Sequence, residues 1–341
     1  MRWLFVLCVV LLAGCGKVTE VREGDLIVPS RGTPSARDVP DTQARGVRIA
    51  RARIVFVTHG QASDPFWTIV RKGLSDAGKQ TQVAVSYRAP DRSSISRMVT
   101  YLDEAIADRP DGLVVSLPDV AALGPSIRRA VRAGIPVITI NSGADDFKSL
   151  GVMAHVGQPE YRAGLESGKR MGRAGVKRAL CVKQESGNSG LDERCRGFAD
   201  GLRKFGGRMR ELSVPLQDPG VSQRRLGSAI AAARVDGILT LGPGGAVPAI
   251  AAVRASGMQG RVTLGTFDLS PDVLAAVRDG QMLFAVDQQP YLQGYLPVIL
   301  LAEEARHGVF PGKGELIPTG PHFVTKEDAA DVIRLSEEGI R

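Results

Sequence analysis

The sequence predicts an α/β protein with two similar lobes, each a doubly wound parallel sheet covered by helices on both faces. Three observations predict this fold class. From Arg53 onward, short runs rich in β-branched residues alternate with helical stretches, which is typical of parallel sheets layered with helices. A strand–helix–strand unit occurs twice, once after Arg109-Pro-Asp-Gly and once after Arg234-Val-Asp-Gly. The length of 341 residues is sufficient for two domains.

The elements of the first half follow this alternation. Strands are predicted at residues 53–60, 83–90, 111–118 and 136–143, and helices from residue 65 and at 94–107 and 122–134. The second half predicts strands at residues 178–185, 210–216, 236–242, 262–268 and 282–288, with helices that include 192–206 and 270–280. Each repeated unit ends in a polar residue at the carboxyl end of a strand, where open α/β sheets bind ligands. The sequence therefore predicts a hinged two-lobe binding protein with a cleft between the lobes.

The first predicted helix begins with two aromatic residues. Asp64 has the chemistry of an N-cap and Pro65 that of a first-turn residue. Helical spacing then predicts a buried stripe that Phe66 can join, made of Ile69, Val70, Gly73, Leu74 and Ala77. Trp67 is offset from this stripe, at the mouth of the helix, where ligands are often bound.

The N-terminus carries a targeting signal. Arg2 supplies a positive charge, and the apolar run that follows is too short to span a bilayer, so residues 1–15 are predicted to be a signal peptide. Leu12-Ala13-Gly14-Cys15 resembles the lipobox of bacterial lipoproteins, which implies that Cys15 is lipidated; an ordinary secretory signal with a chance cysteine is the alternative. Residues 16–52 lack apolar periodicity and are predicted to be a flexible linker.

Two cysteines remain for the folded body. Cys8 leaves with the signal peptide and Cys15 carries the lipid, so Cys181 and Cys195 are an even pair in an oxidising compartment. We expect a disulfide between them, with two buried thiols as the alternative. Neither cysteine has a histidine nearby in the sequence, which argues against a metal site.

Composition and motifs exclude several function classes. The formal net charge is +8, but the basic residues are scattered among acidic ones, so no nucleic-acid partner is predicted. The motifs of serine hydrolases, phosphate-loop enzymes and zinc proteases are absent, and the four histidines are isolated. We therefore expect a protein that is not an enzyme and has no cofactor and no metal. Gly242-Pro243-Gly244-Gly245 is interpreted as a tight turn into a helix, with an anion-binding turn as the alternative.

Four polar residues are candidates for ligand contacts. Asn141, Asp268 and Gln288 each end a predicted strand, and Arg194 lies in the predicted first turn of a helix, where a cation opposes the helix dipole. Each could instead be a cap or a member of a salt bridge. Together they offer the donors and acceptors that bridge vicinal hydroxyl groups. A sugar presents such a polar rim and an apolar C–H face, for which aromatic rings at the helix mouth would be the platform.

Several motifs together resemble a known family. These motifs are DPFW before a helix, PDGLVV, AGIPVITIN, GQPEYRAG, ERCRGF, TFDLSPD and DQQP. Together they make the chain similar to the periplasmic sugar-binding proteins of ABC importers with the type I fold, such as those for ribose, galactose and allose. The resemblance runs from about Arg53 to the last helix. It implies two lobes joined by a multi-strand hinge, with residues 53–157 and 289–316 in the first lobe and 158–288 and 317–341 in the second.

The resemblance also implies a ligand site and partners. By position it assigns ligand contacts to Asp64, Phe66, Trp67, Asn141, Arg194, Asp268 and Gln288. Asn141-Ser142 and Gly242-Pro243 depart from the pattern of ribose-binding members, which argues against ribose as the ligand. The calcium-loop motif of other members is not visible. The family implies a monosaccharide or polyol ligand and ABC permease subunits as partners. We further expect a monomer, anchored in the periplasm through Cys15.

Two other functions remain as alternatives. A receptor that presents its ligand to a chemosensor or sensor kinase would have the same pocket, so the sequence does not separate it from a transport protein. Sugar-responsive repressors share the fold, but the lipobox-like tetrad and the lack of an N-terminal helix-turn-helix argue against a transcriptional regulator.

Overall fold

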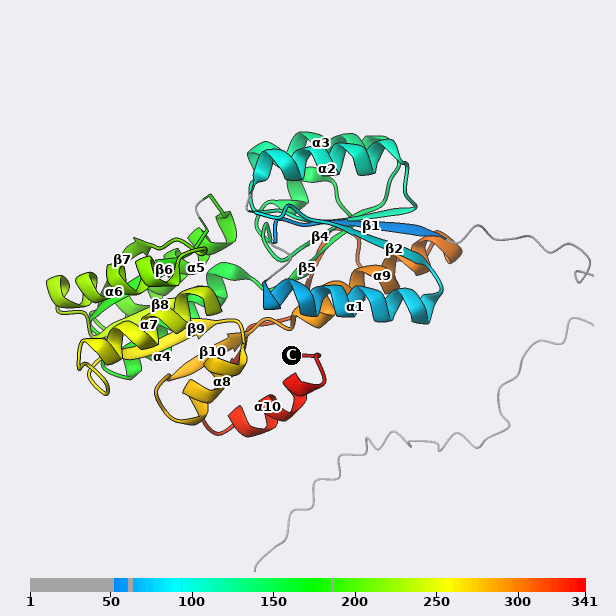
Figure 1. The fold of residues 1–341 in the computed structure, drawn as a ribbon. Coiled ribbons are helices and arrows are strands. Elements are labelled where there is room, and N and C mark those ends of the chain that lie inside the picture. Colours follow the sequence, from blue (N-terminus) through cyan, green and yellow to red (C-terminus); the bar gives the residue numbers. More distant parts are fainter. Residues whose placement is uncertain (1–51, 61–63, 93, 186) are drawn as a thin grey trace, which may run out of the picture. The chain divides into compact units, whose positions relative to one another are not determined.

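The computed structural model describes residues 52–60, 64–92, 94–185 and 187–341 (Figure 1). The predicted signal peptide, Cys15 and the linker up to residue 51 lie outside the described residues. Among the residues that are described, no helix is both long and apolar enough to cross a bilayer.

The first sheet has six parallel strands in the order β11-β5-β4-β3-β1-β2. Its strands are β1 (Arg53–Val57), β2 (Ala84–Arg88), β3 (Gly112–Ser116), β4 (Val137–Ile140), β5 (Ala154–Gly157) and β11 (Glu315–Pro318). Figure 1 shows helices on both faces of this sheet. One face is covered by α2 (Ile95–Ala107) and α3 (Val120–Arg132), and the other face by α1 (Pro65–Thr81) and α9 (Pro290–His307). A separate apolar cluster lies under each layer of helices. A short 3-10 helix, η2 (Phe147–Leu150), lies between β4 and β5.

The second sheet repeats this plan in the order β12-β10-β9-β8-β6-β7. Its strands are β6 (Arg178–Lys183), β7 (Arg208–Ser213), β8 (Gly237–Thr240), β9 (Thr263–Phe267), β10 (Phe284–Asp287) and β12 (His322–Val324). Only β12 runs antiparallel. The helices are α4 (Glu160–Arg173), α5 (Ser189–Arg203), α6 (Pro219–Ala233), α7 (Pro243–Ala255), α8 (Pro271–Arg278) and α10 (Ala329–Glu337). The predicted fold class, two doubly wound parallel sheets, is confirmed.

The internal repeat has a structural counterpart. Arg109 and Arg234 both adopt the left-handed backbone region, with φ of 45° and 48°. Two residues further on, the Asp111 and Asp236 carboxylates accept hydrogen bonds from the backbone N–H groups that begin β1 and β6, at 2.7 and 2.6 Å. The same turn and cap therefore join neighbouring strands in both sheets.

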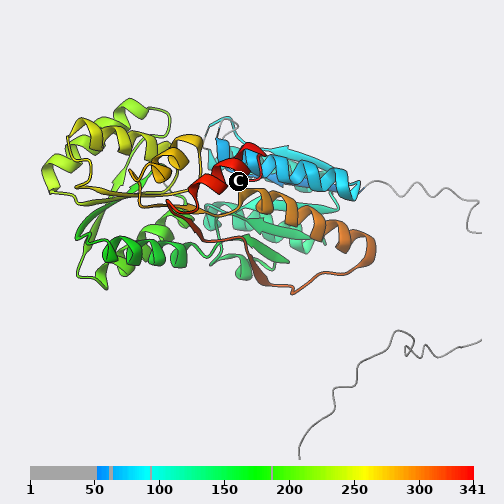
Figure 2. The same ribbon diagram turned by 90° about the horizontal axis from the view of Figure 1, so that it is seen from below.

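Three connections lead from one sheet to the other: β5 to α4, β10 to α9, and β11 to β12. The first crosses residues 158–159 and the second residues 288–289. The predicted division at residue 316 falls inside β11, which stays in the first sheet as far as Pro318, where it pairs with Gly157. Beyond β12, α10 packs against α8, and the chain ends beside α1, where Gly339 lies against the side chain of Lys72 (Figure 2).

Candidate functional site

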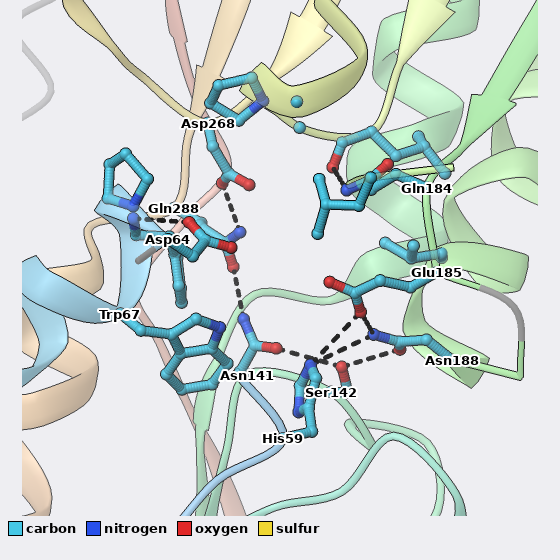
Figure 3. Close-up of a pocket in the computed structure, with 18 of the residues that line it drawn as sticks. His59, Asp64, Trp67, Asn141, Ser142, Gln184, Glu185, Asn188, Asp268 and Gln288 are labelled. Carbon is cyan, nitrogen blue, oxygen red and sulfur yellow. Dashed lines mark hydrogen bonds and ion pairs between the residues drawn. The ribbon is translucent and has the colours of Figure 1, made fainter. Parts of the chain in front are cut away.

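A cavity of about 430 Å³ lies where the carboxyl ends of strands from both sheets meet. This volume is within the range of about 300–1,000 Å³ that small-molecule sites occupy. Figure 3 shows side chains from both sheets pointing into it. The structure brings all seven predicted contact residues to its wall: Asp64, Phe66, Trp67, Asn141, Arg194, Asp268 and Gln288.

One wall of the cavity is a chain of polar side chains. Asn141 Nδ2 donates to Gln288 Oε1 at 3.3 Å, and Gln288 Nε2 donates to Asp268 Oδ1 at 2.5 Å. Asn141 follows β4 and Asp268 follows β9, and both have a φ of 62°, a conformation that Asn and Asp tolerate better than most residues. The equivalent turns of the two sheets therefore face each other through Gln288, which follows β10.

Of the two aromatic residues, Trp67 is more buried than the sequence predicts, whereas Phe66 joins the buried stripe as the sequence allows. Trp67 is 2% exposed and Phe66 7%, and both belong to the apolar cluster beneath α1 and α9 as well as to the cavity wall. Trp67 is therefore not offset from the buried stripe. The indole fits because residue 60 is glycine: a Cβ there would lie 1.9 Å from Trp67 Nε1. The rings of Phe66 and His59 both pack edge-on against it, with centroids 5.1 Å away.

Arg194 is a buried cation with a dedicated partner. Its side chain makes two hydrogen bonds to the Glu160 carboxylate, Nε–Oε2 at 2.6 Å and Nη2–Oε1 at 2.9 Å, and its guanidinium lies 4.4 Å from the centre of the Phe267 ring. The predicted first-turn position is wrong. The side chain of Asn188 caps α5, so the helix begins at Ser189, and Arg194 lies in the second turn.

Close packing of α4 against α5 produces this ion pair. A Cβ on Gly164 of α4 would lie 2.1 Å from the backbone oxygen of Arg194, so only glycine permits the observed approach of the two helices. Glu160 is the first residue of α4, and the approach places its carboxylate beside the guanidinium. The pair is 34 positions apart in sequence and could not be found from local patterns.

A second group of polar residues was missed by the sequence interpretation. Asn188 accepts from Ser142 Oγ at 2.9 Å and donates to Glu185 Oε2 at 2.8 Å, and its Nδ2 lies 3.3 Å from His59 Nε2. Gln184 also lines the cavity, where it donates to the Leu241 oxygen at 3.2 Å. Gln184 and Glu185 directly follow β6, so the strand-end signal used for Asn141 could have found them.

Burial controls the charge state of three groups around the cavity. Burial raises the pKa of Asp64 to about 6, although a hydrogen bond from the backbone N–H of Phe66 opposes the change. Burial also raises the pKa of Asp268 to about 7, against the lowering effects of Arg194 and Gln288. The pKa of His59 is lowered by burial, despite Glu185 nearby, so this imidazole is neutral at pH 7.

The raised pKa of Asp268 predicts a pH dependence of stability. The carboxyl has a pKa of 3.8 in the unfolded chain and about 7 in the folded protein. Between these values the folded state binds more protons, so this group lowers the free energy of unfolding as the pH rises. We expect this fall in wild type but not in Asp268→Asn, so the difference between their free energies of unfolding should change across the window. Urea denaturation below, within and above the window measures this difference. Identical pH profiles for the two proteins would contradict the assignment.

Two other sequence predictions concern the second sheet and its helices. A disulfide joins Cys181 of β6 to Cys195 of α5, with an S–S distance of 2.02 Å, and ties the helix that carries Arg194 to the sheet. The segment from Gly242 forms a turn into α7, which begins at Pro243, and this turn lines the cavity. Among the described residues, no group of three or more His, Cys, Asp or Glu side chains could hold a metal ion.

The comparisons with known proteins agree with this architecture. A family model described as a periplasmic binding protein domain matches residues 54–308. The structure is similar to that of a carbohydrate transporter from Acidothermus cellulolyticus solved in complex with myo-inositol, with 34% identity and a TM-score of 0.80, over 85% of this chain and 100% of that chain.

Two relatives in sequence are also named as sugar-binding proteins. The xylose/arabinose-binding protein of Sulfolobus acidocaldarius is 26% identical over 269 residues, which is 73% of this chain and 65% of that relative. The chain thus spans slightly less than two thirds of that relative's length. The D-ribose/D-allose-binding protein of Pseudomonas aeruginosa is 28% identical over 262 residues, which is 70% of this chain and 77% of that relative. These relatives are sugar-binding proteins and not enzymes.

Proposed function

The chain belongs to the periplasmic binding protein family, among the type I sugar-binding proteins of ABC transporters, and on this premise we propose what it binds and where it acts. It is a lipid-anchored solute-binding protein that takes a monosaccharide or a similar polyol into the cavity between its lobes. It delivers this ligand to the permease subunits of an ABC importer. The lobes are residues 53–157 with 289–318 and residues 158–288 with 319–341.

The observation that carries the proposal is the convergence of seven predicted contact residues on one cavity of about 430 Å³. The polar chain of Asn141, Gln288 and Asp268 presents amide and carboxyl groups that bond to hydroxyls as donors and acceptors. Trp67 supplies aromatic surface to the same space. Such a combination fits a ring with polar substituents and apolar C–H groups.

Both lobes contribute to the cavity, which couples binding to closure. Ser142 and His59 of the first lobe contact Asn188 of the second, and the Ser189 backbone N–H donates to the Pro118 oxygen at 2.9 Å. A ligand that contacts both walls stabilises the closed arrangement by its differential affinity for that state. The permease can then distinguish loaded from empty protein by the arrangement of the lobes.

A thermal-shift screen against monosaccharides, cyclitols and acyclic polyols tests the proposal. Because a ligand that binds only the folded state stabilises it by about 2.7 kcal/mol at one hundred times its Kd, a true ligand gives a large rise in Tm. Any hit is then titrated by calorimetry. If no member of the library binds, the proposed function is wrong.

The lipid anchor is tested separately. Because Cys15 follows Leu12-Ala13-Gly14, Cys15→Ser should abolish lipidation and release the protein from membranes in its native host. Fractionation and metabolic labelling with palmitate measure this, with the Cys8→Ser variant as a control that should remain membrane-bound. A Cys15→Ser protein that still sediments with membranes and still takes up label would disprove the anchor.

A further inference from the structure

The charges around the cavity are strongly unequal. Three carboxylates line it: Asp64 before α1, Glu185 after β6 and Asp268 after β9. Arg194 is the only lysine or arginine among the described lining residues. The carboxylates lie within electrostatic range of one another, since Glu185 raises the pKa of Asp64 and Asp64 raises that of Asp268.

Arg194 does not balance these carboxylates, because Glu160 already neutralises it through two hydrogen bonds. The guanidinium also donates to the Leu241 oxygen at 3.3 Å. Arg71 lowers the pKa of Asp64 but packs on the Tyr87 ring and does not line the cavity. His59 is neutral at pH 7 because burial lowers its pKa. The cavity therefore has a net excess of negative charge.

Each of the three carboxylates has one oxygen left for a ligand. Asp64 uses Oδ1 to cap α1, Asp268 uses Oδ1 to accept from Gln288, and Glu185 uses Oε2 to accept from Asn188. Among the described residues, the second oxygen of each makes no hydrogen bond. Figure 3 shows the three side chains around the same open space. Asp64 caps α1 and Asn188 caps α5, and both of these helices begin at the cavity. α7 also begins there, at Pro243, without a side-chain cap. The partial positive charge of its N-terminus, about half an elementary charge, is smaller than the charge of the carboxylates.

We propose that the ligand is a polyhydroxylated ring that carries a protonated amine, such as an amino sugar or an aminocyclitol, with the ammonium group held among Asp64, Glu185 and Asp268. This inference rests on the proposed function and names the ligand class of the same cavity. An ammonium group has three donors and matches the three unused carboxylate oxygens. A neutral sugar could donate hydroxyl groups to these oxygens but would leave the excess negative charge of the cavity uncompensated, and an anionic sugar would be repelled.

The test compares pairs of probes that differ only in the amine: D-glucosamine with D-glucose, D-galactosamine with D-galactose, and an aminodeoxyinositol with myo-inositol. Calorimetric titration at pH 7 should give at least a tenfold lower Kd for the amine in one or more pairs. The cation lowers the pKa values of Asp64 and Asp268, so the amine should release protons on binding near pH 6, whereas its hydroxyl parent should release fewer. Titrations in two buffers of different ionisation enthalpy measure this release.

Variants assign the preference to the carboxylates. Asp64→Asn and Glu185→Gln should each reduce the preference for the amine, which is the Kd of the hydroxyl parent divided by the Kd of the amine, at least threefold. Binding of the hydroxyl parent should change less. Asp119→Asn is the matched control, because Asp119 caps α3 as Asp64 caps α1 but does not line the cavity. It should leave the ratio unchanged.

The outcomes separate the two proposals. If the hydroxyl parent binds as tightly as the amine in every pair that binds, the amine proposal is wrong and the proposed function stands. An amine preference that persists in both Asp64→Asn and Glu185→Gln would also contradict the amine proposal. If neither member of any pair binds and the polyol screen is also empty, the proposed function fails together with this inference.

Discussion

Arg194→Ala is expected to destabilise the folded protein by about 3–5 kcal/mol, because it leaves the Glu160 carboxylate buried without its partner. Arg194 is 3% exposed and Glu160 is also 3% exposed, so water does not replace the lost bonds. A role as a ligand contact alone would predict a loss of ligand affinity without a loss of stability. The bidentate pair changes that expectation, and we expect both losses.

A double-mutant cycle measures the interaction. The combined variant Arg194→Ala, Glu160→Ala should be less destabilised than the sum of the two single variants, with a coupling energy of about 1–3 kcal/mol. Arg196→Ala is the matched control on the same helix, since Arg196 is exposed and pairs with Glu193 at the surface. It should change the free energy of unfolding by less than about 0.5 kcal/mol. Additive effects in the cycle would contradict the proposed dependence of Arg194 on Glu160.

Trp67→Ala should cost about 3–5 kcal/mol of stability, the usual loss for a large buried aromatic residue. The side chain is 2% exposed and packs in the cluster beneath α1 and α9. Trp67→Phe keeps a ring at this position and should retain most of that stability. Urea denaturation of the three proteins measures both effects. A Trp67→Ala protein as stable as wild type would place the indole outside the core.

The same residue reports on ligand binding. Trp67 is the only tryptophan among the described residues, and the other tryptophan of the sequence, Trp3, lies in the predicted signal peptide. Because the indole lines the cavity, a ligand that enters should change its emission. Closure of the two lobes would add to the change. Unmoved emission with a tight ligand would place the binding site elsewhere.

The fold could be predicted from the sequence because its elements are local and repeated. Short β-branched runs followed by amphipathic helices specify each strand–helix unit, and the turns at Arg109 and Arg234 repeat the same backbone conformation. The meeting of polar residues from strand ends was predictable for the same reason: a parallel sheet brings its carboxyl ends to one edge. Asn141 and Asp268 could therefore be expected at the cavity wall without any tertiary information.

The rest depends on contacts between distant segments. Glu160 meets Arg194 only because Gly164 lets α4 approach α5, and Trp67 is buried only because Gly60 leaves space for its ring. The start of α5 was placed too late because Gly190 is a poor helix former, whereas the Asn188 cap fixes the helix three residues earlier than predicted. The end of β11 is set by its pairing with β5, which no local pattern reveals.

Calorimetric titration of the Asp268→Asn variant tests most directly whether the cavity between the lobes is the sugar site. Asn keeps the left-handed turn at this position but removes the charge that faces the cavity. Asp218→Asn is the matched control in the same lobe, because Asp218 caps α6 without lining the cavity itself and Asn caps equally well. With the tightest ligand from the screen, we expect at least a tenfold rise in Kd for Asp268→Asn, about 1.4 kcal/mol or more, and no change for Asp218→Asn. Wild-type affinity in the Asp268→Asn protein would contradict the assignment of this cavity as the binding site.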